Sequence, residues 1–408
     1  MLESCFIGWC QFIERHRVRM ACHRLTIALL LVALLLVALL ATTSLKACPF
    51  CEATSPTWLQ TVAEAETAVV ARAVKVQSPA KGDDVVPLVD VTFELVEVLR
   101  GQEQLRGTRQ FHCELLETPR VGAQWLLTGA GAPQISWSPL AELTPERAKY
   151  FATARKLPST GNTRWQWFYQ YLEHADELLA ADAYGEFAGA PFAEVQGFAS
   201  EIKRAHLWQW IRREQTPEHR RGLYYTMLGV CGNAADVTTL EALLVTPAKR
   251  PPGGFDALIA CYLSLRGEAG LKVVEAKLLQ DKAAREEDVQ AVLLALRFHG
   301  EEQHVLKRTR IAQAYRLVLD RPQLAGVVIP DLARWQDWGS MDALVALFKA
   351  SDREAQWLRI PIVAYLRACP LPKAKEQLTQ LAKIDPEAIE QADSLSLFGV
   401  KLRGVPKP

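Results

Sequence analysis

The 408-residue sequence has almost no excess of charge of either sign, and it lacks the local motifs of familiar catalytic sites. It carries 47 Lys and Arg residues against 46 Asp and Glu residues. This balance provides no global electrostatic reason to expect binding to nucleic acid or to an anionic lipid surface. G-x-S-x-G, phosphate-loop, dinucleotide and zinc-protease motifs are absent. We therefore expect a non-enzymatic protein with no catalytic residue, cofactor or resident metal ion.

The first 47 residues differ in character from the rest of the chain. An apolar run at 25–41 follows a basic stretch and leads through small residues to Ala47, which is the pattern of a secretory signal peptide. A permanent membrane helix is the alternative, although the run is shorter than the roughly 20 residues such a helix needs. Met20 offers an internal start. We predict cleavage near Ala47 and an exported protein, located in the periplasm, the cell envelope or outside the cell. Removal of 1–47 leaves 42 basic and 44 acidic residues.

Residues 68–137 have the two-residue period of β-strands. In LVDVTFELVEVLRG, Val89, Val91 and Phe93 share one face, whereas Asp90 and Thr92 occupy the other. AVVARAVKV, TRQFHCELL and QWLLTG predict further strands, separated by turn-rich pieces. Several short strands favour a small closed sheet, because closure removes exposed edges. PTWLQTVAEAE predicts a preceding helix, and Thr144 with Pro145 predicts the start of a following one.

From residue 164 the period becomes helical, after a linker at 158–163. Five segments repeat a plan of apolar helix, short break and second amphipathic helix. Their breaks fall 35, 33, 39 and 31 residues apart, at Gly232, Gly267, Gly300, Gly339 and Pro370. Such spacing is typical of stacked helix pairs. We predict a multidomain α+β protein, with an OB-like antiparallel β-barrel at 48–157, an all-α solenoid at 164–400 and a tail at 401–408.

Two known architectures resemble these parts. The N-terminal cysteines, the short helix, ETAVVARAVKV, VTFELVEVLRG and GAQWLLTG resemble the netrin-like domain of tissue inhibitors of metalloproteinases, an OB-type barrel, over 48 to about 140. LGVCG and its counterparts resemble the turns of HEAT repeats. The order of CPFC, DAYGEFA, ALRF and DLARWQDW resembles a family of secreted bacterial proteins, and this likeness implies architecture and no chemistry.

The CPFC segment leaves several interpretations open. Redox catalysis, a zinc site and acylation of Cys48 as a lipid anchor are alternatives, and haem attachment is excluded because Glu52 replaces the required histidine. The inhibitor resemblance implies zinc chelation by the amine and carbonyl of Cys48, but Pro49 and the C-x-x-C spacing depart from the C-x-C start. We favour a disulfide from Cys48 or Cys51 to Cys113, which closes a loop of roughly 60 residues and contributes about 3–4 kcal/mol.

The segment KRAHLWQWIRREQTPEHRR gathers six cations around two tryptophans. They are a candidate binding surface for an acidic polymer such as a sulfated glycan: Lys203, Arg204, Arg212, Arg213, Arg220 and Arg221. The alternative is a solvated helix face with buried tryptophans. Solenoids usually bind macromolecules, so we expect a scaffold or interaction protein whose partner is a protein or an envelope polymer. Thiol–disulfide exchange or metalloprotease inhibition through CPFC is the competing hypothesis.

Overall fold

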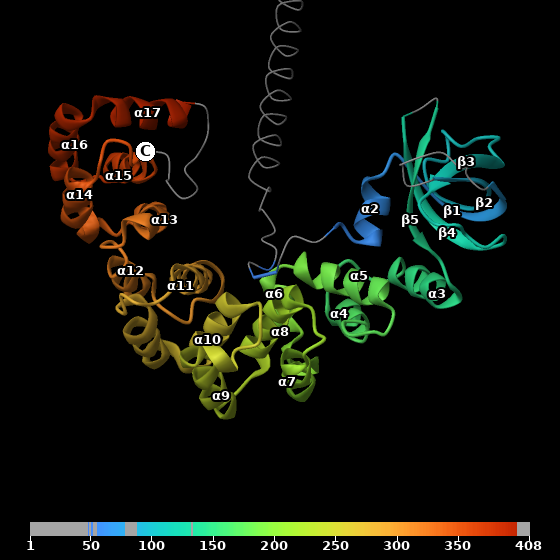
Figure 1. Cartoon of the computed structure of the whole chain (residues 1–408), viewed down its shortest axis with the longest axis horizontal. Helices are drawn as coiled ribbons and strands as arrows, with labels where there is room; N and C mark the ends of the chain where they lie inside the picture. Colours follow the sequence, from blue (N-terminus) through green and yellow to red (C-terminus); the bar gives the residue numbers. More distant parts are fainter. Residues whose placement is uncertain (1–47, 49, 52–54, 78–87, 132–133, 398–408) are drawn as a thin grey trace, which may run out of the picture. The chain divides into compact units, whose positions relative to one another are not determined.

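The computed structural model describes residues 48, 50–51, 55–77, 88–131 and 134–397 (Figure 1). The predicted signal peptide at 1–47, the start at Met20 and the predicted tail at 401–408 lie outside the described residues. Within them the chain is an α+β protein, in which an antiparallel sheet precedes fifteen α-helices, α3 to α17.

The sheet has five strands in the order β3-β2-β1-β4-β5. Their bounds are β1 Thr67–Gln77, β2 Val89–Arg100, β3 Gln110–Leu115, β4 Gln124–Ala130 and β5 Ser136–Glu142. The sheet is open, so the predicted closure into a barrel is wrong. The two edge strands are short, and Pro139 in β5 has no N–H to donate. The two edge strands contact each other through side chains, because the rings of Phe111 in β3 and Trp137 in β5 stack with their centroids 4.1 Å apart.

The predicted alternation in β2 is confirmed. Val89, Val91 and Phe93 are buried and contribute to the core of the sheet. β1 is buried over its first five residues, since β2 and β4 pair with it on either side. The sequence pattern did not predict strand β5, because SWSPLAE contains a proline and has no apolar alternation.

Two helices flank the sheet in the sequence, as predicted. In α2 (Trp58–Glu64) the Thr57 hydroxyl accepts from the Gln60 amide, and the Gln60 side chain accepts from the Thr57 amide. This reciprocal cap satisfies two otherwise free N–H groups. In α3 (Pro145–Ala154) the Thr144 hydroxyl caps the first turn.

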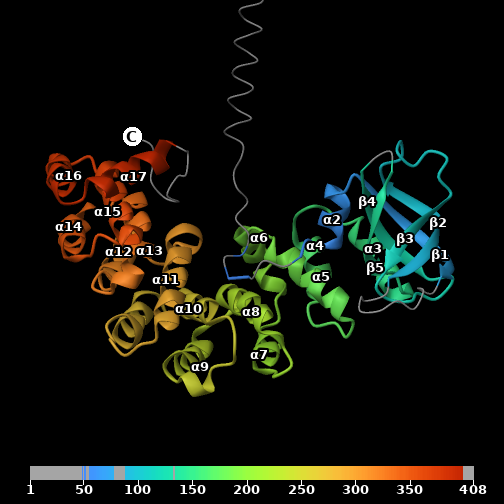
Figure 2. The same cartoon turned by 45° about the horizontal axis from the view of Figure 1, so that its top comes forward.

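The remaining helices follow without an intervening strand in the described residues (Figure 2). Their bounds are α4 Asn162–Tyr169, α5 Glu177–Ala188, α6 Phe192–Gly197, α7 Arg204–Arg212, α8 Glu218–Cys231, α9 Ala234–Val245, α10 Phe255–Val274, α11 Glu286–Phe298, α12 Arg308–Arg316, α13 Pro322–Arg334, α14 Met341–Ala350, α15 Gln356–Ala368, α16 Pro372–Ile384 and α17 Pro386–Leu397. Short 3-10 or π segments lie at Ala199–Glu201, Pro247–Lys249, Glu275–Leu279, His299–Gln303 and Trp338–Ser340.

The predicted breaks between helices are confirmed. Gly232 ends α8, Pro370 lies between α15 and α16, and Gly339 separates α13 from α14. Gly267 interrupts α10 with a φ of 58°, a conformation that glycine adopts without steric cost. Gly300 lies in the π segment after α11. The helix–break–helix plan is therefore present, and membership of the HEAT class remains a prediction.

Candidate functional site

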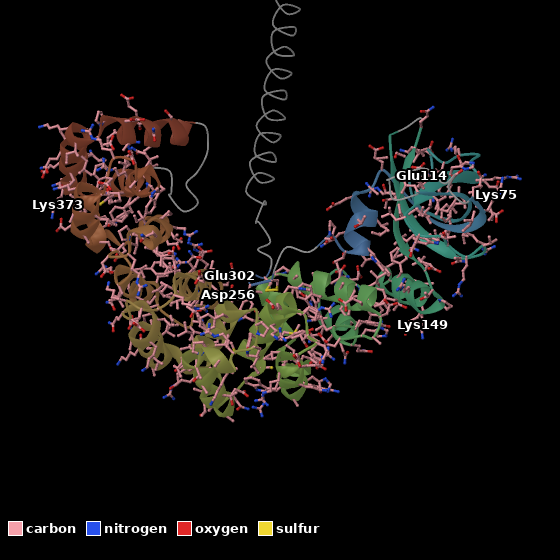
Figure 3. The ribbon with its side chains drawn as sticks, in the orientation of Figure 1. Lys75, Glu114, Lys149, Asp256, Glu302 and Lys373 are labelled. Carbon is pink, nitrogen blue, oxygen red and sulfur yellow. A yellow bond between two sulfur atoms is a disulfide. The ribbon has the colours of Figure 1, made fainter. Side chains whose placement is uncertain are left out.

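Cys48 and Cys51 form a disulfide with each other, with their Cα atoms 5.4 Å apart. The predicted bond from either of them to Cys113 is therefore wrong. Cys113 is a free thiol on the inward face of β3, and its Sγ lies 3.6 Å from the Trp137 carbonyl oxygen. Burial raises the pKa of this thiol to about 11, so it is protonated and unreactive at neutral pH. The disulfide is the yellow bond in Figure 3.

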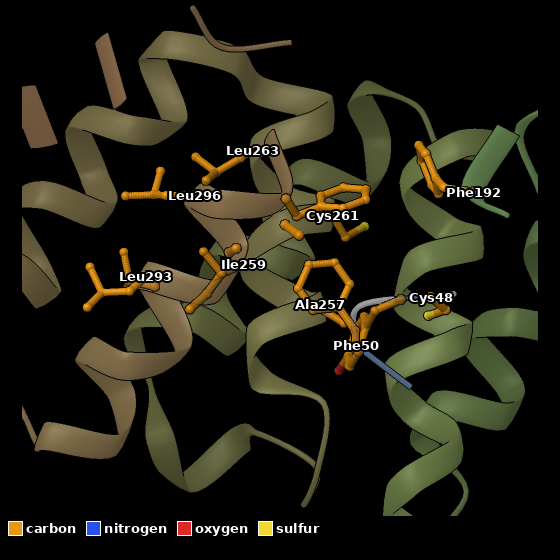
Figure 4. Packing of buried hydrophobic residues seen from close by; sticks show 14 of the residues in the cluster. Cys48, Phe50, Phe192, Ala257, Ile259, Cys261, Leu263, Leu293 and Leu296 are labelled. Carbon is orange, nitrogen blue, oxygen red and sulfur yellow. The ribbon is translucent and has the colours of Figure 1, made fainter. Parts of the chain in front are cut away.

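The disulfide closes a short segment whose described residues, Cys48, Phe50 and Cys51, pack against the helices, and we call these three residues the CPFC turn. The Cys48 amide donates to the Ala188 carbonyl at the end of α5, at 3.1 Å. Phe50, labelled in Figure 4, is only 6% exposed. Its ring and that of Phe298 pack edge to face, with centroids 4.9 Å apart. The backbone oxygen of Phe50 approaches Gly222 so closely that a Cβ there would lie 2.2 Å from it. Gly222 is thus required for the turn to reach α8.

The DAYGEFA segment of α5 connects the helices to the sheet part of the chain. Asp182 accepts a hydrogen bond from the Trp58 amide and another from the Tyr150 hydroxyl, both at 2.7 Å. These donors belong to α2 and α3, so one carboxylate joins three helices. Burial raises its pKa to about 6. Four residues further on, Glu186 forms a buried ion pair with Arg164 of α4.

The ALRF and DLARWQDW segments contact each other. Arg297 in α11 donates to Asp331 in α13 at 2.7 Å, and burial raises the pKa of that carboxylate despite the arginine. The ring of Trp335 covers Gly300, where a Cβ would lie 2.5 Å from it. Next to Gly300, the His299 ring is fully buried, with Nε2 3.0 Å from the Ala260 carbonyl, and burial lowers its pKa to about 4. These residues hold helices together.

The six predicted cations do not share one exposed surface. Arg220 and Arg221 are 2% and 1% exposed, so their assignment to a surface is wrong. Arg221 donates to the backbone oxygens of Ile211 and Pro252, at 3.1 and 2.8 Å. Arg220 pairs with Glu177. Guanidinium groups can be buried here because each meets a carboxylate or carbonyl acceptor.

The other four cations lie nearer to solvent. Arg204 pairs with Asp236 at 2.7 Å, and Arg213 pairs with Glu173. The Arg212 guanidinium lies over the Trp208 ring, 4.7 Å from its centroid, in a cation–π contact. Lys203 is exposed. Most of the positive charge is therefore matched within the protein, which weakens the case for a polyanion site.

An open groove of 520 Å³ lies beside this segment, between α4 and α7, and we call it the α4–α7 groove. Its aromatic members are Tyr169, Phe198 and Trp210. Tyr169 and Trp210 have ring centroids 5.5 Å apart, and Trp210 is half-buried. The remaining members are polar and include three glutamines. Sequence reasoning selected Lys203 and placed Trp210 in the same segment. It did not bring Gln166 and Tyr169 of α4 to them, because Tyr169 and Lys203 are 34 residues apart in the sequence.

Comparison with family models, with curated proteins and with solved structures found no match in any of the three. Among the residues that the structure describes, no helix has both the length and the apolar character needed to cross a membrane. The same residues hold no group of three or more His, Cys, Asp or Glu side chains placed to bind a metal ion.

Proposed function

We propose that this protein is an exported, non-enzymatic scaffold that binds a macromolecular partner, a protein or an envelope polymer, through its helical part. The observation that carries the proposal is the α4–α7 groove, in which polar side chains surround the half-buried ring of Trp210 and the buried rings of Tyr169 and Phe198. Ligand sites typically combine an apolar surface with a few polar groups that fix orientation, in volumes of about 300–1,000 Å³. The groove has both properties.

The chemistry of the conspicuous motifs supports a role without catalysis. Thiols act as nucleophiles in their ionised form, and burial raises the pKa of both Cys113 and Cys231 to about 11. The imidazole of His299 is inaccessible to a substrate because it is fully buried. The carboxylate oxygens of Asp182 and Asp331 accept hydrogen bonds from other helices. Each motif has a structural use.

We also propose that the sheet part is an open variant of the netrin-like, OB-type fold and that the helices form HEAT-like pairs. The stacked rings of Phe111 and Trp137, which lie where a barrel would close, support the first assignment. The positions of the breaks between helices support the second.

Two roles of the CPFC turn compete with the scaffold hypothesis. Thiol–disulfide exchange is favoured by the linked pair and by the partial exposure of Cys51. Metalloprotease inhibition requires a free amine on Cys48, yet that nitrogen donates to Ala188 and the residue is 6% exposed. Attachment of a lipid to Cys48 requires a free thiol, whereas the sulfur of Cys48 is bonded to that of Cys51. Intact mass and N-terminal peptide mapping, with and without reduction, distinguish these states and locate the cleavage site.

Site-specific crosslinking tests the scaffold hypothesis. A photoreactive residue replaces Gln209, which is exposed in the groove, and in a matched variant it replaces Gln280, which is exposed after α10 and outside the groove. We expect irradiation of cells to give a discrete adduct at position 209 and none at position 280. No adduct at either position, or the same adducts at both, would contradict a partner in the groove. Turnover of a substrate by the purified protein would contradict the non-enzymatic role.

A further inference from the structure

The α4–α7 groove has an aromatic base with an unused hydrogen-bond donor. The Tyr169 ring is 8% exposed and packs between Phe198, at 5.7 Å, and Trp210, at 5.5 Å between centroids. Its hydroxyl oxygen accepts from the Lys203 amide at 3.2 Å. Within the described residues the hydroxyl hydrogen has no acceptor. A buried hydroxyl that retains a donor at the wall of a groove is a point where a ligand oxygen can bind.

The charges of the groove nearly cancel. The side chain of Glu173 is 6% exposed, already pairs with Arg213 and Arg220, and accepts from the Tyr224 hydroxyl. Of the other ionic side chains in the lining, one is an exposed carboxylate, Glu201, and one is an exposed ammonium, Lys203. A polyanion would meet this carboxylate without a matching excess of cations. The lining is therefore suited to a ligand without net charge.

Three amide side chains surround the aromatic base: Gln166, Gln170 and Gln209. Each amide both donates and accepts hydrogen bonds, as a sugar hydroxyl does. Trp210 and Tyr169 join an apolar ring face to a polar tip, which fits a pyranose ring with its apolar C–H face and its rim of hydroxyls. The Tyr169 hydroxyl adds selectivity, because a buried donor left without an acceptor is costly.

We infer that the α4–α7 groove binds a neutral oligosaccharide, with the ring of Trp210 against a sugar face and the glutamine amides on its hydroxyls. This inference rests on the proposed function and specifies its partner as a neutral glycan of the envelope. It differs from the sulfated glycan predicted from the cationic segment, because four of the five arginines of that segment are paired or buried.

Titration calorimetry on the mature protein tests the inference with three probes. They are the tetrasaccharides of β-1,4-linked N-acetylglucosamine and of β-1,4-linked glucose, and a heparin tetrasaccharide as the sulfated arm. We expect at least one neutral tetrasaccharide to bind, and Trp210→Ala to weaken it by at least about tenfold, the size of an aromatic anchor's contribution. Trp357→Ala is the matched control, because Trp357 is 51% exposed on α15 and lies outside the groove. It should leave affinity unchanged.

A second variant separates loss of the site from loss of folding in Trp210→Ala. Gln166→Ala combined with Gln209→Ala changes only exposed groove residues, and we expect it to weaken the same sugar by at least about tenfold without a change in melting temperature. Neutral binding that survives both groove variants would overturn the site. Binding of the heparin probe alone, or of no probe, would overturn the ligand class. In either of those cases a crosslink at position 209 would still support the scaffold role, whereas its absence would remove both proposals.

Discussion

Replacement of Asp182 by asparagine tests whether the DAYGEFA segment joins the helices to the sheet part through a buried carboxylate. In D182N the introduced amide oxygen can still accept from the Trp58 amide, and the introduced NH2 group can donate to the Tyr150 oxygen. The variant therefore keeps the shape of the junction and removes only the ionisable group. Asp352→Asn, at an exposed aspartate after α14, is the matched control.

The direction of the effect follows from the pKa of Asp182, which burial raises from 3.8 to about 6. Between these values the folded protein holds a proton that the unfolded chain releases. The free energy of unfolding of the wild type must then fall as the pH rises through this window, and level off above pH 6. The difference of about two pKa units corresponds to about 3 kcal/mol. Of the charged groups near Asp182, Glu186 raises its pKa and Arg164 lowers it.

Chemical unfolding monitored by far-UV circular dichroism, from pH 4 to pH 8, supplies the measurement. We expect D182N and the wild type to have similar stability at pH 4, and D182N to be more stable by up to about 3 kcal/mol at pH 8. Other titrating groups cancel in the difference between the two proteins. A difference that does not change with pH, or a loss of stability in D182N at pH 8, would refute the reasoning. D352N should follow the wild type throughout.

Two further substitutions and one labelling experiment examine the packing. Gly222→Ala places a Cβ 2.2 Å from a backbone oxygen of the CPFC turn, so we expect it to lower the free energy of unfolding by about 1–3 kcal/mol. Gly229→Ala, on the same helix, would place its Cβ in ordinary van der Waals contact and should not lower it. Equal effects of the two substitutions would mean that the turn does not pack against Gly222. Arg220→Ala should cost about 1.5–3 kcal/mol, because it removes a buried cation from Glu173, a buried carboxylate that keeps Arg213 as its other partner. Lys203→Ala should cost less than about 0.5 kcal/mol. An Arg220→Ala variant as stable as the wild type would restore the surface interpretation. Alkylation and peptide mapping at pH 7.5 should label Cys113 only after unfolding, and rapid labelling of the native protein would contradict its burial.

Periodicity was sufficient to predict most of the local structure, strand β5 excepted. The alternation around Phe93 and the glycine break at Gly267 were read correctly because neighbours in sequence determine them. Arg220 was misassigned because its partner Glu173 lies 47 residues earlier in the sequence, and periodicity carries no information about such a contact. The disulfide was misassigned for a related reason, since Cys48 and Cys51 satisfy each other within one turn and leave Cys113 to the core of the sheet.

The segments CPFC, DAYGEFA, ALRF and DLARWQDW form one connected set of contacts. The CPFC turn joins DAYGEFA through the Cys48 amide and the Ala188 carbonyl, and it joins ALRF through Phe50 and Phe298. ALRF in turn joins DLARWQDW through an arginine–aspartate pair. These contacts link residues separated by up to 248 positions, from Phe50 to Phe298, so each motif depends on another that is remote in the chain. The motifs therefore specify how the CPFC turn is held against the helices, and the residues that choose a partner should be sought outside them, first in the α4–α7 groove.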